Sequence, residues 1–172
     1  MTGQWKRSMP SFSADLKFGQ EAETKILEKF KEHLEAIDGR SGDFKIKGTD
    51  IKIELKSDKY SHDKYPNFIM ERFGSAGKDG GPFKALNDGC RYFIYSFAND
   101  NIMYIFDTVQ LVARIKKLVK KLGLKLHTIE NVSWSTQYYK IERKHFEDLY
   151  KPESVLYTKP IRTKNAKNSK KS

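Results

Sequence analysis

A run of alternating side chains between Gly42 and Asp58 constrains the fold of this chain more than any other segment. Apolar residues fall on one side of a period-of-two pattern and charged residues on the other, which is typical of a half-buried β-strand. Gly48 and Thr49 interrupt the pattern, and glycine is favoured in the tight turns that join antiparallel strands. The segment therefore predicts a β-hairpin over residues 43–57. Its apolar side comprises Phe44, Ile46, Ile51, Ile53 and Leu55, and its charged side comprises Asp43, Lys45, Lys47, Asp50, Lys52, Glu54 and Lys56.

The two-residue turn predicts which charged residues face one another across the hairpin. Lys45 would face Lys52, and Asp43 would face Glu54, with directly opposed side chains about 5 Å apart at Cβ. Two carboxylates this close repel each other unless a cation lies between them, so the pair favours a divalent metal ion. Lys56 points to the same side, one pleat beyond Glu54. The structural alternative is a solvent-facing hairpin held by charge pairs.

A second observation comes from the segment before the hairpin. Apolar residues at helical spacing predict a helix that begins at Leu16 or Phe18 and ends at Ile37, before residues 38–39. Glu23 falls near the middle of its apolar side. A glutamate on a buried helix face is costly unless it is paired or linked to a metal. Glu23 is therefore a third candidate carboxylate, with a structural ion pair as the alternative.

The rest of the pattern predicts an α/β fold with a central mixed β-sheet flanked by helices. Further strands are expected over residues 68–73, 91–97, 102–106 and 138–142, and further helices from Pro82, over residues 108–122 and over residues 145–150. We expect a flexible leader over residues 1–15, one domain over residues 16–157 and a disordered basic tail over residues 158–172.

Composition narrows the class of protein. A chain of 172 residues fits one domain, and its single cysteine excludes an internal disulfide framework or a cysteine-rich zinc site. No apolar run reaches the length of about 18 residues that spans a bilayer, so we expect no membrane partner and a cytoplasmic location. The net charge is +11, and the tail from Thr158 onward contains six basic residues and no acid. Such a tail binds polyanions or simply keeps the chain in solution.

At this point the chain resembles the PD-(D/E)xK nuclease superfamily, and in particular its small phage-type endonucleases. The resemblance rests on Glu23 in the first helix, Asp43 at the hairpin entrance, and the run Glu54-Leu55-Lys56 on the next strand. Gly42 stands where the family has a proline. The resemblance covers roughly residues 18–107 and implies a restriction-endonuclease-like core.

The resemblance also implies roles for these residues. Asp43 and Glu54 would bind Mg²⁺, with the Leu55 carbonyl as a further ligand, and Mn²⁺ is expected to substitute. Glu23 would complete the metal site directly or through water, and Lys56 would sit beside the attacking water and the scissile phosphate. The expected activity is hydrolysis of DNA phosphodiester bonds, structure-directed or weakly sequence-specific. Phosphate contacts are expected from Lys84, Lys116, Lys120, Lys164 and Lys167.

Several alternatives remain open. The same fold could serve as a scaffold for nucleic-acid binding without catalysis, or the substrate could be RNA. A homodimer would suit paired cuts, and a phage origin, which is suggested by the resemblance alone, would place the protein in the host cytoplasm. The four histidines are scattered without zinc-ligand spacing, and we interpret them as structural or surface residues.

Overall fold

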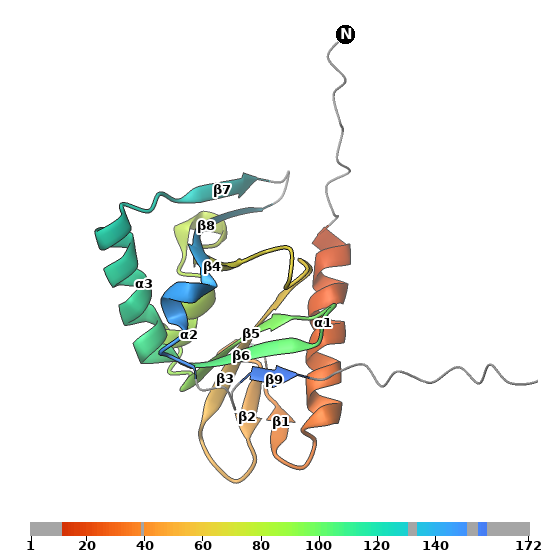
Figure 1. Cartoon of the computed structure of the whole chain (residues 1–172). Coiled ribbons are helices and arrows are strands. Elements are labelled where there is room, and N and C mark those ends of the chain that lie inside the picture. Colours follow the sequence, from red (N-terminus) through yellow and green to blue (C-terminus); the bar gives the residue numbers. More distant parts are fainter. Residues whose placement is uncertain (1–11, 39, 131–133, 151–154, 158–172) are drawn as a thin grey trace, which may run out of the picture.

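The computed structural model describes residues 12–38, 40–130, 134–150 and 155–157. Within these residues the larger sheet has six strands in the order β1-β2-β3-β5-β6-β9 (Figure 1). The pair β3 and β5 is parallel, whereas the other neighbours are antiparallel, so the sheet is mixed. These strands are β1 (Leu34–Ala36), β2 (Phe44–Ile46), β3 (Lys52–Asp58), β5 (Tyr92–Phe97), β6 (Ile102–Asp107) and β9 (Val155–Tyr157).

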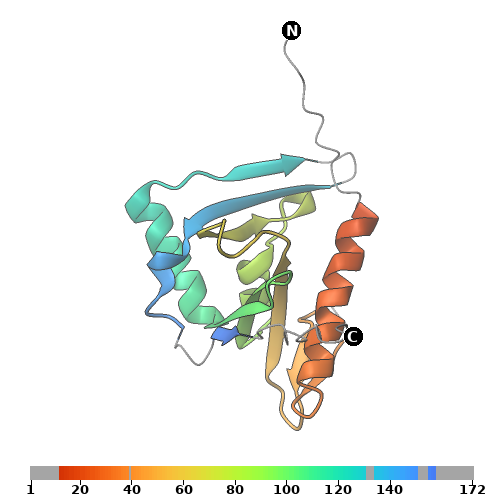
Figure 2. The same cartoon turned by 45° about the vertical axis from the view of Figure 1, so that its right-hand side comes forward.

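A second sheet and three α-helices complete the described part of the chain. The second sheet has the order β4-β8-β7, with β4 (Asn67–Phe73), β7 (His127–Glu130) and β8 (Ser135–Glu142). The α-helices are α1 (Phe12–Lys29), α2 (Gly81–Asn87) and α3 (Thr108–Leu122), and short 3₁₀ turns cover Ser75–Gly77 and Arg143–Phe146. In Figures 1 and 2, α1 lies on one side of the molecule and α3 on the other. The prediction of an α/β fold with a mixed sheet is confirmed.

Two hydrophobic clusters fix the faces of the larger sheet. The smaller cluster joins α1 to one face through Ile26, Ile53 and Ile94. The larger cluster is aromatic and lies on the other face, against α2, α3 and the second sheet. Since side chains alternate along a strand, Ile53 and Leu55 face α1, whereas Glu54 and Lys56 face the opposite side of β3.

Several predicted elements are confirmed at their expected positions. The hairpin has the predicted register, with Lys45 opposite Lys52, and Gly48 occupies the turn with a positive φ of 74°. The helix α3 begins after Asp107, whose carboxylate accepts a hydrogen bond from the Gln110 amide at 3.1 Å, and it ends at a left-handed Gly123.

The first helix departs from its prediction at both ends. It begins at Phe12, inside the segment expected to be a leader, and ends at Lys29 rather than Ile37. Residues Leu34–Ala36 instead form β1, which pairs antiparallel with β2. Phe30 and Leu34 pack against the smaller cluster in this arrangement, and a continuing helix would have put apolar residues at the same positions. Pairing with β2 therefore decides the conformation, and the hydrophobic spacing alone does not reveal it.

The C-terminal part also differs from its prediction. The strand expected over residues 138–142 begins earlier, at Ser135, and it pairs with β4 and β7 outside the central sheet. The helix expected over residues 145–150 is a 3₁₀ turn over Arg143–Phe146. The strands β7 and β9 were not predicted, and all four residues of β7 are exposed, so no burial pattern signals it. The predicted break at Gly39, leader residues 1–11 and the tail from residue 158 lie outside the described residues.

Candidate active site

The hairpin brings Asp43 and Glu54 to the same place. Phe44 pairs with Ile53, so the next pair outward is Asp43 and Glu54. The Asp43 amide donates to the Ile53 carbonyl at 2.9 Å, and the Leu55 amide donates to Asp43 Oδ2 at 2.7 Å. The Asp43 side chain thus extends the ladder where the strand pairing ends. The Leu55 backbone is turned toward Asp43, which is where a carbonyl ligand would be needed.

The two carboxylates are half-buried and raise each other's cost of ionisation. Burial, together with the smaller effect of the nearby Asp43 charge, raises the pKa of Glu54 to about 7. Burial also raises the pKa of Asp43, although the hydrogen bond from Leu55 and the positive charge of Lys84 oppose that increase. Within the described residues, no hydrogen-bond donor contacts the Glu54 carboxylate. An acid pair left in this state attracts a cation.

Glu23 of α1 lies near enough to the pair for its charge to act on Glu54. Its neighbours Ala22 and Ile26 are buried, while Glu23 itself is half-buried. Burial raises the pKa of Glu23, and the charge of Asp43 adds to the effect. Glu23 in turn contributes to the raised pKa of Glu54. The three predicted acids therefore share one electrostatic environment, although they come from a helix and two strands.

The carboxylate and carbonyl oxygens of the site are suitable ligands for Mg²⁺. Their arrangement limits how many side chains can bind the ion directly. Among the described residues, no three His, Cys, Asp or Glu side chains form a group ready to hold a metal ion. Mg²⁺ is commonly bound by one or two carboxylates and keeps several waters. Asp43 and Glu54, with the Leu55 carbonyl, suit this mode, and Glu23 suits a contact through water.

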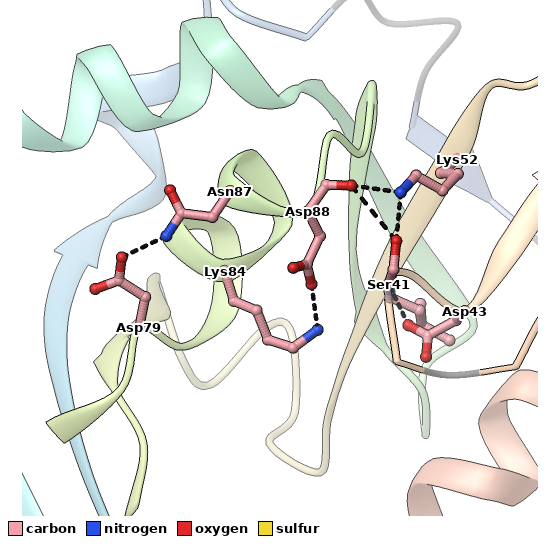
Figure 3. Close-up of polar contacts among 8 residues, drawn as sticks. Ser41, Asp43, Lys52, Asp79, Lys84, Asn87 and Asp88 are labelled. Carbon is pink, nitrogen blue, oxygen red and sulfur yellow. Dashed lines mark hydrogen bonds and ion pairs between the residues drawn. The ribbon is translucent and has the colours of Figure 1, made fainter. Parts of the chain in front are cut away.

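Lys84 lies closer to the acids than its predicted role as a phosphate contact suggested. This α2 residue places Nζ 2.6 Å from Asp88 Oδ2, and its charge lowers the pKa of both Asp43 and Glu54. Figure 3 shows Lys84 and Asp88 beside the segment that carries Asp43. The sequence signal was the four-residue spacing of Lys84 and Asp88 on one helix face, but no local pattern linked α2 to the hairpin.

A second lysine joins α2 to the hairpin. Lys52 Nζ donates to Ser41 Oγ and to the Asp88 carbonyl, as Figure 3 shows. These bonds connect the end of α2, the loop before Asp43 and the strand β3. The hydrogen bonds of Lys52 therefore hold the Asp88 end of α2, and with it Lys84, against the hairpin.

Lys56 projects from β3 beside a cavity of about 610 Å³ and shares its wall with Glu23. Lys56 and Lys84 thus lie on different elements around the acids.

The predicted phosphate contacts Lys116 and Lys120 are exposed on α3, on the other side of the molecule from α1 (Figures 1 and 2). The structure does not bring them to the acid pair. Lys164 and Lys167 lie outside the described residues.

Gly42 stands where the nuclease superfamily that the sequence resembles has a proline, and its backbone conformation accounts for the difference. Its φ is +96°, whereas proline is locked near −65°. A Cβ at this position would lie 3.0 Å from Cys90 Sγ and 3.2 Å from the Ile53 carbonyl oxygen. The chain therefore enters the Asp43 strand by a conformation that proline does not adopt.

Comparison of the chain with family models, curated proteins and solved structures found no match. Within the described residues, no helix is long and apolar enough to cross a membrane.

Proposed function

We propose that this chain is a Mg²⁺-dependent DNA endonuclease of the PD-(D/E)xK type, built on a restriction-endonuclease-like core. The observation that carries the proposal is the Asp43 and Glu54 pair, half-buried, mutually repelling and next to Glu23. Such a set is stable as an ionised site when a divalent cation compensates its charge. Mn²⁺ would substitute for Mg²⁺.

The roles follow from position. A bound Mg²⁺ would polarise the scissile phosphate and lower the pKa of a water. Asp43 and Glu54 would hold the ion through their carboxylate oxygens, and Glu23 would orient a water in its shell. Lys56 would place positive charge where negative charge develops on the phosphate. The Lys84 charge would favour the ionised forms of Asp43 and Glu54, because it opposes the rise in their pKa that burial causes.

DNA is the proposed partner because the chain carries a net charge of +11, and basic proteins gain affinity for polyphosphates by releasing counterions. Assembly into a homodimer would allow two coordinated cuts. Sedimentation of the protein with and without DNA distinguishes a monomer from a dimer.

Cleavage assays test the proposal directly. Labelled plasmid, linear duplex, single strand and four-way junction are incubated with Mg²⁺, Mn²⁺ or EDTA, using the wild type and Glu54→Gln. We expect metal-dependent cutting that EDTA and the substitution both abolish. Equal cutting by the wild type and Glu54→Gln would contradict the proposal.

A second candidate is a nucleic-acid-binding protein without catalysis. It is favoured by the finding that no three metal-ligating side chains form a ready group among the described residues. This candidate predicts DNA binding without cutting under any metal, and DNA affinity that Glu54→Gln does not lower.

A further inference from the structure

The cavity beside Lys56 has features that the proposed metal chemistry does not use. Its volume of about 610 Å³ lies within the range of small-molecule sites. Three aromatic residues from separate parts of the chain contribute to its wall: Phe18 from α1, Tyr60 from the loop after β3, and Trp134, which directly precedes β8. Ile69 and Ile129 add apolar surface. The wall is therefore suited to a flat, apolar group.

Two polar atoms of the same wall are buried and find no hydrogen-bond partner among the residues that the structure describes. These are Ser57 Oγ and Trp134 Nε1, and both residues line the cavity. Buried polar groups in folded proteins are nearly always satisfied, so these two atoms are the groups of the wall that are open to the polar edge of a ligand. Trp134 offers a donor, and the Ser57 hydroxyl offers a donor and an acceptor.

The charged residues of the cavity wall differ in whether other side chains already bind them. Lys59 is paired with Asp15 at 2.5 Å and lies 5.0 Å from the centre of the Phe18 ring. Asp58 accepts hydrogen bonds from the Tyr95 hydroxyl and the Tyr60 amide. Lys56 has no ion-pair partner among the described residues, so its charge is available to an anion at the cavity mouth.

The cavity also adjoins an edge of the sheet. The pairing of β2 with β3 stops at Ile53, and beyond it no described strand pairs with β3 on that side. Leu55, Lys56 and Ser57 of this edge line the cavity together with Glu23. A ligand in the cavity would therefore lie directly next to the proposed catalytic groups.

We propose that this cavity binds an unpaired nucleobase of the DNA substrate, adjacent to the scissile phosphate. The inference rests on the proposed function and names its substrate class: DNA with a single-stranded or readily unstacked nucleotide at the cut. Aromatic side chains stack on any base, because every base has a π-face. The Trp134 and Ser57 groups would hydrogen-bond the base edge, and Lys56 would contact its phosphate.

An intact duplex does not offer the same match. Its bases are stacked, so it presents phosphates and groove edges to a protein rather than base faces. A concave aromatic wall gains nothing from that surface. Single strands, flaps and loops expose base faces without the cost of unstacking.

The first experiment separates the base from the phosphate backbone. The chain has two tryptophans, so Trp5→Phe leaves Trp134 as the fluorescent reporter. In this background with Glu54→Gln, which prevents cutting, we compare a short oligothymidylate with an abasic strand of equal length and charge. We expect quenching of Trp134 by the oligothymidylate and about tenfold weaker binding of the abasic strand.

Variants of the cavity wall complete the test. Tyr60→Leu and Ser57→Ala are expected to weaken oligothymidylate binding while leaving abasic-strand binding unchanged. The control is Tyr92→Leu, since Tyr92 lines a different pocket on the α1 face of the sheet. Circular dichroism and thermal unfolding verify that each variant folds. Equal affinity for both strands, or unchanged affinity in both wall variants, would overturn the inference.

The outcome is independent of whether the protein cuts DNA. Metal-dependent cutting with no base dependence would support the proposed function and overturn the base pocket. Base-dependent binding that the wall variants weaken, without cutting under any metal, would support the pocket and refute the nuclease.

Discussion

At the scale of residues, the decisive group is the Glu54 carboxylate, whose pKa lies near 7 because of burial and the Asp43 charge. A carboxylic acid with this pKa keeps its proton in the folded state at a pH where the unfolded chain has lost it. The acid pair therefore destabilises the metal-free fold as the pH rises. A bound divalent cation would remove that cost and would compete with the proton for the same oxygens.

The first prediction concerns stability against pH. The folded pKa of Glu54 is about 7 and the unfolded value is 4.5, so the free energy of unfolding should fall as the pH rises between those values. The loss is up to about 3 kcal/mol. Urea unfolding of the metal-free protein at several pH values measures it. Glu54→Gln should reduce the fall, and the part that remains is expected from the raised pKa values of Asp43 and Glu23. The exposed Glu28→Gln should retain the full fall; a fall of equal size in both variants would refute this assignment.

The second prediction separates the two lysines near the acids. Lys56→Ala should lower kcat about 10²-fold or more, because its charge is needed in the transition state. Lys84→Ala should instead shift the pH profile of cleavage to higher pH, since the Lys84 charge lowers the pKa of Asp43 and Glu54. Rates measured over a pH series decide between these effects, with the exposed Lys120→Ala as the control. An unchanged profile in Lys84→Ala would show that its charge does not act on the acids.

At the scale of elements, the sequence predicts what local patterns determine. The hairpin register follows from alternation and a two-residue turn, and the limits of α3 follow from Asp107 and Gly123. The strand β1 was missed because pairing with β2, rather than local preference, makes it a strand. The approach of Lys84 to Asp43 likewise depends on packing between segments about forty residues apart in the sequence. Tertiary contacts of this kind leave no periodic signal.

The third prediction concerns Gly42 at the entrance to β2. In Gly42→Ala, the alanine would have to adopt a φ of +96°, and its Cβ would lie 3.0 Å from Cys90 Sγ and 3.2 Å from the Ile53 carbonyl oxygen. The substitution should therefore lower the free energy of unfolding by about 1–3 kcal/mol. Gly48→Ala is the matched control, because its φ is +74° and nothing lies within 4 Å of the added Cβ. Urea unfolding should rank Gly42→Ala as the more destabilising. Equal losses would mean that the neighbours of Gly42 adjust freely.

At the scale of the whole molecule, charge is divided between the described part and the tail from residue 158, which contributes six basic residues to the net +11. The acids of the site lie on α1, on β3 and directly before β2, whereas Lys116 and Lys120 belong to α3, on the other side of the molecule from α1 (Figures 1 and 2). Under the proposed function, attraction of DNA and cleavage of DNA would therefore fall to different parts of the chain.

The fourth prediction follows from this division. Removal of the residues after Tyr157 should weaken DNA binding most at low salt and reduce the salt dependence of the binding constant, by about 0.9 per lost phosphate contact on duplex DNA. The cleavage rate under saturating DNA should stay unchanged. Binding titrations at several salt concentrations and single-turnover cleavage measure both quantities. A lower rate at saturation would assign the tail a role in the chemistry.

The parallel pairing of β3 and β5 has a consequence for how such a protein can diversify. Parallel neighbours cannot be joined by a tight turn, and here the connection is a long excursion that includes β4 and α2. That excursion supplies Tyr60, Ile69 and Lys84, while the acids belong to the segments before it. Tyr60 and Ile69 of the proposed base pocket are therefore encoded in a stretch of the gene separate from the one that encodes Glu23, Asp43 and Glu54. Exchanging the stretch between the two strands would change this part of the proposed pocket and leave the three carboxylates in place.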